Sequence, residues 1–416
     1  MILALSQNPY LPLWEYIPDG EPYVFEDPDR PFVTCNWRKD NPRLTDGVLG
    51  FDPAVFVDDD GRVYGYWGFE RSYAAELDPL TMCTVRPGTG IIDGMIGDSK
   101  AGDNRFMFYE ASSMRKIEDK YVFIYSRKTQ EGEFGLPSSN YTLAYAYGDS
   151  PLGPWTYGGT LIDARARDVD PSGKVIATAV PYGNTHGSLV EAGGRWWVFY
   201  HRQTGTDEYS RQAMVAPVEV KVQKGKGGKV VISEGEYTSE GFRTGGLDPL
   251  VRTPAGLACY LLNPEGVTQS YPNFFFSGSY VKPTRAEGIH EALLSQRDPF
   301  CPVVNNTSGS IVGYKYFNFD AVAGQPLRLT MDVVPQGVDG EIAVLVGGPS
   351  PRQGGRVIAT IRISSTEPES LARKTVTCKA ISGKAGRQPL YFAFSASEKG
   401  VSICELHAFQ FSCPRR

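Results

Sequence analysis

Apolar and polar positions alternate along much of this chain, and three stretches repeat one arrangement. In each, an apolar strand leads into a tight polar turn, and a basic residue opens a second strand rich in aromatic side chains. Asp and Gly in such turns accept the backbone angles that a tight hairpin requires. Each stretch is therefore predicted to be a β-hairpin. The three are FVDDDGRVYGYWG (56–68), MRKIEDKYVFIYS (114–126) and LVEAGGRWWVFYH (189–201).

The hairpins recur at intervals of 58 and 75 residues, and further strand pairs follow each of them. Radial repetition of small antiparallel sheets is typical of a β-propeller. Asp52 and Glu110 stand just before the first and second hairpins, and His186 takes the same place before the third. We therefore expect these three side chains to converge on one face of the propeller.

The last hundred residues have a plainer alternation. About seven short apolar segments, separated by turn residues, predict a β-sandwich. They are IVGYKYFNFD, PLRLTMDVVP, GEIAVLVGG, RVIATIRIS, RKTVTCKAIS, PLYFAFSAS and ICELHAFQFSC, between residues 311 and 413. The change of pattern, with a Gly/Pro-rich stretch at 245–256, indicates a domain boundary. We predict a propeller over 1–244, a connector over 245–297 and the sandwich over 298–416.

Composition supports an all-β fold, because 46 Gly, 30 Pro and 12% aromatic residues favour short strands and turns over helices. A net charge of −5 without a basic stripe argues against nucleic-acid binding. No run of 18 apolar residues predicts a membrane span. The opening residues lack the basic segment and long apolar core of a secretory signal, so a cytoplasmic location is expected. Seven cysteines without a C-x-x-C pair indicate reduced, mostly buried thiols.

Four motifs, in this order, resemble those of glycoside hydrolase family 43: NPYLPLWEYIPDGEP, FDPAVFVDDDGRVYGYWGF, FYEASSMRKIEDKYVFIYS and NTHGSLVEAGGRWWVFYHR. The C-terminal sandwich is similar to family 6 carbohydrate-binding modules. The resemblance implies a five-bladed propeller and an inverting glycosidase. Its expected substrates are terminal furanose or pentose residues of plant or microbial polysaccharide. These residues would be linked as α-L-arabinofuranosides, β-D-galactofuranosides or β-D-xylosides.

Inverting hydrolysis needs a carboxylic acid that protonates the leaving oxygen and a carboxylate, about 6.5–9.5 Å away, that activates water. By resemblance, Glu110 is the general acid and Asp52 a third carboxylate that orients it. A like charge nearby also disfavours ionisation of the acid. The structural alternatives are a turn residue before Pro53 for Asp52, and a surface residue at a strand start for Glu110.

The base is expected in the PDGEP segment. Matching the carboxylate-Pro pair of the family puts Glu21 in this role, and Asp19 is the alternative. A polar turn explains Asp19 better than it explains Glu21.

Further contacts are assigned to substrate. The resemblance puts His186 at the propeller axis, as a floor residue of the site and as a candidate contact of a structural calcium ion. Arg202 and Arg211 are candidate donors to sugar hydroxyls, with surface ion pairs as the alternative. Trp67 is a candidate stacking platform, with core packing as the alternative. The chemistry requires no cofactor.

One departure from the family pattern stands out. Glu21 and Asp52 are only 31 residues apart, whereas a single blade takes about 40–45 residues. The chain is therefore predicted to be shortened between about 27 and 45, with three blades plus an N-terminal strand and about two blades missing. Exposed strand faces would then be covered by repacking, the sandwich or a second copy of the chain. A non-catalytic carbohydrate-binding protein, derived from such a hydrolase, is the alternative function.

Overall fold

The computed structural model describes eleven stretches of the chain, and almost all of its regular structure is β-strand. The all-β prediction is confirmed. Asp19, Glu21 and the predicted shortening between about 27 and 45 lie outside the described residues. No helix in the described part is long and apolar enough to cross a membrane. The described residues are 48–97, 105–138, 142–163, 165–170, 172, 174–177, 185–203, 211–262, 278–282, 301–381 and 385–414.

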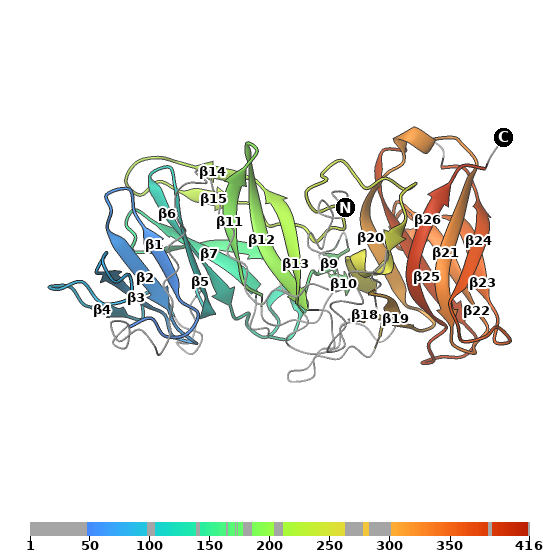
Figure 1. Cartoon of the computed structure of the whole chain (residues 1–416), viewed down its shortest axis with the longest axis horizontal. Helices are drawn as coiled ribbons and strands as arrows, with labels where there is room; N and C mark the ends of the chain where they lie inside the picture. The colour runs from blue at the N-terminus through green and yellow to red at the C-terminus, as the bar shows by residue number, and fades with distance from the viewer. Residues whose placement is uncertain are drawn as a thin grey trace.

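Three antiparallel sheets follow one another in the first half of the chain, each built from strands in sequence order (Figure 1). The first contains β1 (Ala54–Val57), β2 (Val63–Trp67), β3 (Tyr73–Leu77) and β4 (Ile91–Asp93). The second contains β5 (Phe108–Ile117), β6 (Lys120–Arg127), β7 (Thr142–Gly148) and β8 (Thr156–Ile162). The third contains β11 (Gly187–Ala192), β12 (Arg195–Gln203) and β13 (Arg211–Val218). Two ribbons pair β9 (Asp168–Val169) with β10 (Val175–Ala177), and β14 (Val220–Val222) with β15 (Val230–Ile232).

All three predicted hairpins are present, as β1–β2, β5–β6 and β11–β12. In the third, Gly193 and Gly194 form a two-residue turn with φ of 61° and 71°, as a tight hairpin turn requires. The first differs from expectation, because residues 58–62 form a longer loop. The Asp58 N–H donates to the Arg62 carbonyl across this loop at 2.9 Å.

Neighbouring sheets pack through their apolar faces, as the blades of a propeller do. Tyr66 of the first sheet lies against Phe123 of the second, with ring centroids 5.6 Å apart. Val122 and Ile124 of the second sheet share a buried cluster with Val198 of the third. The three sheets expected from the hairpins are thus present in the described part of the chain, and the number of blades stays a prediction. The loss of two others remains a prediction.

The second half is a sandwich of two antiparallel sheets, which lies at the opposite end of the long axis in Figure 1. One sheet has the order β18-β19-β26-β21-β24, with β16 beside β26, and the other has the order β17-β20-β25-β22-β23. The strands are β16 (Thr253–Pro254), β17 (Tyr260–Leu262), β18 (Tyr280–Val281), β19 (Val303–Asn306), β20 (Ile311–Asn318), β21 (Leu327–Pro335), β22 (Gly340–Val346), β23 (Arg356–Ile363), β24 (Ala372–Cys378), β25 (Arg387–Ala396) and β26 (Cys404–Ser412).

The seven predicted sandwich strands are all present, as β20 to β26. The predicted connector is corrected, because β16, β17 and β18 fall within 245–297 and pair with sandwich strands. These strands are two or three residues long, too short for alternation to reveal them. The sandwich therefore begins before residue 298.

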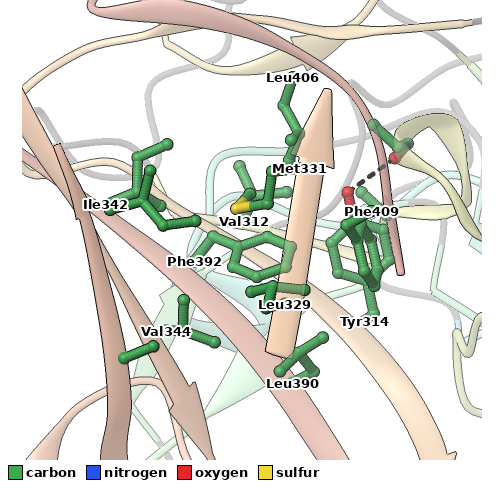
Figure 2. Close-up of a cluster of buried hydrophobic side chains, with 14 of the residues drawn as sticks. Val312, Tyr314, Leu329, Met331, Ile342, Val344, Leu390, Phe392, Leu406 and Phe409 are labelled. Atoms are coloured by element: carbon green, nitrogen blue, oxygen red, sulfur yellow. Dashed lines mark hydrogen bonds between the residues drawn. The ribbon is translucent and has the colours of Figure 1, made fainter. Parts of the chain in front are cut away.

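The sandwich core lies between its two sheets, where Phe392 packs against Phe409 with ring centroids 4.9 Å apart (Figure 2). The Tyr314 hydroxyl, within this core, donates to the Ala255 carbonyl at 2.9 Å, which is the dashed line in Figure 2. Ala255 belongs to the short 3-10 turn η3 (Ala255–Leu257). One buried tyrosine thus fixes the entry of the chain into the sandwich.

Candidate active site

Asp52, Glu110 and His186 meet in space, as the sequence predicts. Glu110 Oε1 lies 3.1 Å from His186 Nε2, and Asp52 Oδ2 lies 3.4 Å from the same nitrogen. A carboxylate oxygen of Asp52, a carboxylate oxygen of Glu110 and a ring nitrogen of His186 all lie within 4.8 Å of one another. Each residue comes from the start of a different sheet, so the packing of the sheets creates the cluster.

The backbone near both carboxylates departs from regular strand geometry. Asp52 has φ of 46° just before β1, and Ala111 has φ of 62° directly after Glu110. Positive φ is costly for residues other than glycine and persists where surrounding structure enforces it. The pairing of β5 with β6 also shifts register between Glu110 and Ser113. Bulges of this kind re-aim side chains, and here the bulge follows the predicted acid.

His186 is held from behind by a second histidine. The His186 backbone N–H donates to His201 Nε2 at 3.2 Å, and the two rings are stacked with centroids 5.6 Å apart. Burial, the nearby His186 and the positive charge of Arg211 together lower the pKa of His201 well below its usual value. His201 is therefore neutral and accepts the bond. The sequence motif THGSL predicted His186, whereas nothing in its pattern pointed to His201.

A glycine next to His186 permits the close approach of two strands. A Cβ atom on Gly187 would lie 2.1 Å from the carbonyl oxygen of Phe199 on β12. That distance is far shorter than any normal contact, so a side chain at this position would push β11 away from β12. Gly187 thereby fixes where His186 enters the cluster.

A cavity of about 360 Å³ opens beside the cluster. Asp52 and His186 line it, together with Ser112 and Arg115. Glu110 lies behind this lining, only 3% exposed and in contact with His186. The Ser112 hydroxyl is buried and has no hydrogen-bond partner among the described residues. Ser112 is a potential ligand-binding group that the sequence pattern did not single out.

A calcium contact is predicted at His186, and the donor atoms of the cluster are those of Asp52, Glu110 and His186. Calcium takes 6–8 oxygen ligands, whereas the cluster offers two carboxyl groups and one imidazole nitrogen. The described residues therefore do not by themselves form a calcium shell. The calcium contact at His186 stays a prediction, and no step proposed below uses an ion.

Arg202 does not reach the cluster, and its predicted contact with sugar is corrected. The side chain is 1% exposed, and its guanidinium donates to Gln212 Oε1 at 3.1 and 3.0 Å. It also donates to the carbonyl oxygens of Gly256 and Ala258. Arg202 thus joins the third sheet to the start of the sandwich. A buried cation with this many acceptors is a structural residue.

Trp67 is likewise corrected, because its ring lies in the core of the first sheet. It is 6% exposed and stacks on Tyr73 with centroids 6.0 Å apart. Core packing, the alternative reading of its position in β2, accounts for it. Arg211 opens β13 opposite Gln203 and is partly buried. Its predicted contact with substrate stays a prediction.

In comparison with known protein families, residues 24–223 match the sequence model of glycosyl hydrolases family 43. A xylosidase/arabinosidase of Thermoclostridium stercorarium is 27% identical over 289 residues, covering 67% of this chain and 56% of that protein. An arabinoxylan arabinofuranohydrolase of Paenibacillus polymyxa is 24% identical over 402 residues, covering 88% of this chain and 52% of that protein. The chain thus spans about half the length of these relatives.

Solved structures give weaker similarities. A family 43 arabinoxylan arabinofuranohydrolase from Bacillus subtilis, in complex with cellotetraose, is 21% identical with a TM-score of 0.42. The match covers 92% of this chain and 70% of that one. A family 6 carbohydrate-binding module from Clostridium cellulolyticum, in complex with xylose, covers 27% of this chain and 78% of its own, with 18% identity and a TM-score of 0.23. The sequence match is the stronger finding: residues 24–223 of this chain are similar to glycosyl hydrolases family 43.

Proposed function

We propose that the chain is a glycosidase that hydrolyses O-glycosyl bonds of terminal sugar residues in arabinoxylan-type polysaccharide. The observation that carries this proposal is the convergence of Asp52, Glu110 and His186 from three separate sheets. The match of residues 24–223 to a hydrolase family supports it. Partners are accordingly oligosaccharides or polysaccharide side chains.

Distances distinguish the roles of the two carboxylates. Carboxyl oxygens of Asp52 and Glu110 lie within 4.8 Å, less than the about 6.5–9.5 Å of an inverting acid and base pair. No water fits between an acid and a base at that separation. Asp52 is therefore proposed to position Glu110 through their shared contact with His186. The base is then Glu21 or Asp19, as the sequence resemblance implies.

Glu110 is proposed to give its proton to the departing oxygen. In the structure His186 engages its carboxyl group, so Glu110 has to rotate from that contact to meet a sugar in the adjacent cavity. The bond between the anomeric carbon and the departing oxygen breaks as the proton arrives, and an activated water forms the new bond. Arrival of water from the opposite face gives inversion.

The names of the relatives favour particular sugars. They are described as xylosidase/arabinosidase, β-xylosidase and arabinoxylan arabinofuranohydrolase. We therefore propose α-L-arabinofuranosides and β-D-xylosides before β-D-galactofuranosides. The low exposure of Glu110 favours a second candidate function. In this alternative the protein binds carbohydrate and does not hydrolyse it.

Turnover of aryl α-L-arabinofuranoside, β-D-xyloside and β-D-galactofuranoside tests the proposal. Release of single sugars from the first two is expected, with the anomeric configuration of the first product measured by proton NMR before mutarotation. Product of retained configuration would contradict the inverting step. Absence of turnover on all three, with saturable binding of xylo-oligosaccharide, would favour the binding protein.

A further inference from the structure

A second cavity, of about 270 Å³, lies between the propeller sheets and the sandwich. Its walls come from the segment after β8 and β9, from residues 234–237 after β15, and from Cys259, Tyr260 and Lys315 of the sandwich. Asp52, Glu110 and His186 line none of it. Its volume is just below the roughly 300–1,000 Å³ of typical small-molecule sites, which limits a ligand to about one ring.

Two buried tyrosines in this cavity carry hydroxyl groups that lack partners. Tyr237 is 5% exposed and Tyr260 is 2% exposed, and both line the cavity. Neither hydroxyl has a hydrogen-bond partner among the described residues. Burial raises the pKa of both, so each stays protonated and able to donate. Buried polar groups nearly always find a partner, so two orphaned hydroxyls in one wall point to an occupant that supplies acceptors.

The charged residues around the cavity are paired with one another. Arg167 contacts Asp163 at 3.0 Å and Glu234 at 3.1 Å. Lys315 contacts Glu236 at 3.3 Å. A metal cation would have to displace Arg167 or Lys315, and an anion would have to displace their carboxylates. The lining therefore favours a ligand without net charge.

The carboxylates of these ion pairs can still accept hydrogen bonds from a ligand, because a carboxylate offers about four acceptor sites. A sugar presents hydroxyls that both donate and accept, and its ring can lie against an aromatic side chain. We propose that this cavity binds one neutral monosaccharide unit, free or at the end of a glycan, at the junction of propeller and sandwich. The site is separate from the hydrolytic cluster, so it does not rest on the proposed function.

The test is a binding titration of the full-length chain with D-xylose, L-arabinose and methyl β-D-xylopyranoside, followed by ligand-observed NMR. The titration uses the Glu110→Gln background, in which slower turnover of the glycoside is expected. Two classes of site are expected, and Tyr260→Phe should weaken one of them about tenfold, as loss of one buried hydrogen bond to a ligand would. Val169→Trp, at a 46% exposed lining position, should block the same class by filling the entrance.

Tyr391→Phe is the matched control, because Tyr391 packs edge-on against Tyr260 and is not part of the cavity wall. It should leave both classes unchanged, and thermal unfolding should show that all variants fold. The proposal is overturned if Tyr260→Phe and Val169→Trp leave sugar binding intact, or if Tyr391→Phe weakens it equally. Binding of calcium chloride that Glu236→Gln abolishes, without any second sugar site, would also overturn it in favour of a cation. Failure of hydrolysis would not affect these outcomes.

Discussion

Two groups of buried charged side chains differ in how completely their charges are paired. They are the Asp52–Glu110–His186 cluster and the junction around Arg202. At the junction, Arg202 fills its donors with Gln212 and two backbone carbonyls. Glu240, 2% exposed, forms two bonds of 2.7 and 2.6 Å with Arg387 across the same boundary. In the cluster, two carboxylates share one imidazole nitrogen beside an open cavity.

The difference shows how burial and pairing together separate structural from functional charge. A buried charge is costly unless it is fully paired, so the junction residues gain their stability from complete hydrogen bonding. The cluster instead places two carboxyl groups together, and φ is positive at Asp52 and at Ala111, which follows Glu110. Such an arrangement persists because neighbouring sheets enforce it, and it leaves groups available for chemistry. The comparison predicts loss of activity from the cluster and loss of stability from the junction.

The largest effect is expected from Glu110→Gln. This change keeps the shape of the side chain and removes its transferable proton, so turnover should fall by ~10² or more. Substrates whose leaving group needs no protonation should suffer least. Steady-state kinetics on aryl arabinofuranosides with leaving groups of different acidity measures this. Glu191→Gln, at an exposed position of β11, is the control. Equal turnover in Glu110→Gln and the parent would remove Glu110 from the mechanism.

Arg202→Met tests the junction, where we expect a loss of stability and no loss of activity. It leaves the Gly256 and Ala258 carbonyls buried without their donor, so the free energy of unfolding should fall by about 2–5 kcal/mol. Urea unfolding measures the loss, with Arg195→Met, exposed on the same strand, as a control that should change little. Activity of the remaining folded protein should match the parent. A selective loss of substrate affinity without a stability change would restore Arg202 to the sugar site.

Glu240→Gln should produce a smaller loss at the same junction. It keeps one acceptor and removes the charge opposite Arg387, which we expect to cost about 1–2 kcal/mol. A double-mutant cycle with Arg387→Gln isolates the pair from other effects. A coupling energy near zero would mean that this ion pair does not join the two domains energetically.

The smallest effect concerns pH and His201. The unfolded imidazole takes up a proton below its ordinary pKa near 6.5, whereas burial keeps the folded His201 neutral to much lower pH. The unfolded state then binds more protons, so stability should fall as pH drops below 6.5, by at most about 1.4 kcal/mol per unit from this group. His201→Asn should flatten the fall in unfolding midpoint between pH 6.5 and 5, relative to the parent. Parallel pH profiles would show that His201 is protonated in the fold.

The sequence predicted the elements with strong local signals. Alternation located the three hairpins and the seven strands β20 to β26, because each signal lies within about ten residues. It did not reveal β16, β17 and β18, whose two or three residues carry no period and which form only beside sandwich strands already in place. Among the site residues, motif order identified Asp52, Glu110 and His186. It gave no means of distinguishing Arg202 at the junction from an arginine at a sugar site.

What the sequence determined by itself is therefore the all-β character, the strand-turn-strand units and the similarity of the N-terminal segment to a hydrolase family, since these depend on neighbouring residues. Tertiary structure alone decided the contact of both carboxylates with His186 Nε2, the support from His201 and the pairing of Arg202 with carbonyls 54 and 56 residues away. The physical reason is that burial and hydrogen bonding depend on which surfaces meet. Those surfaces come from segments distant in sequence, and no local pattern records their approach.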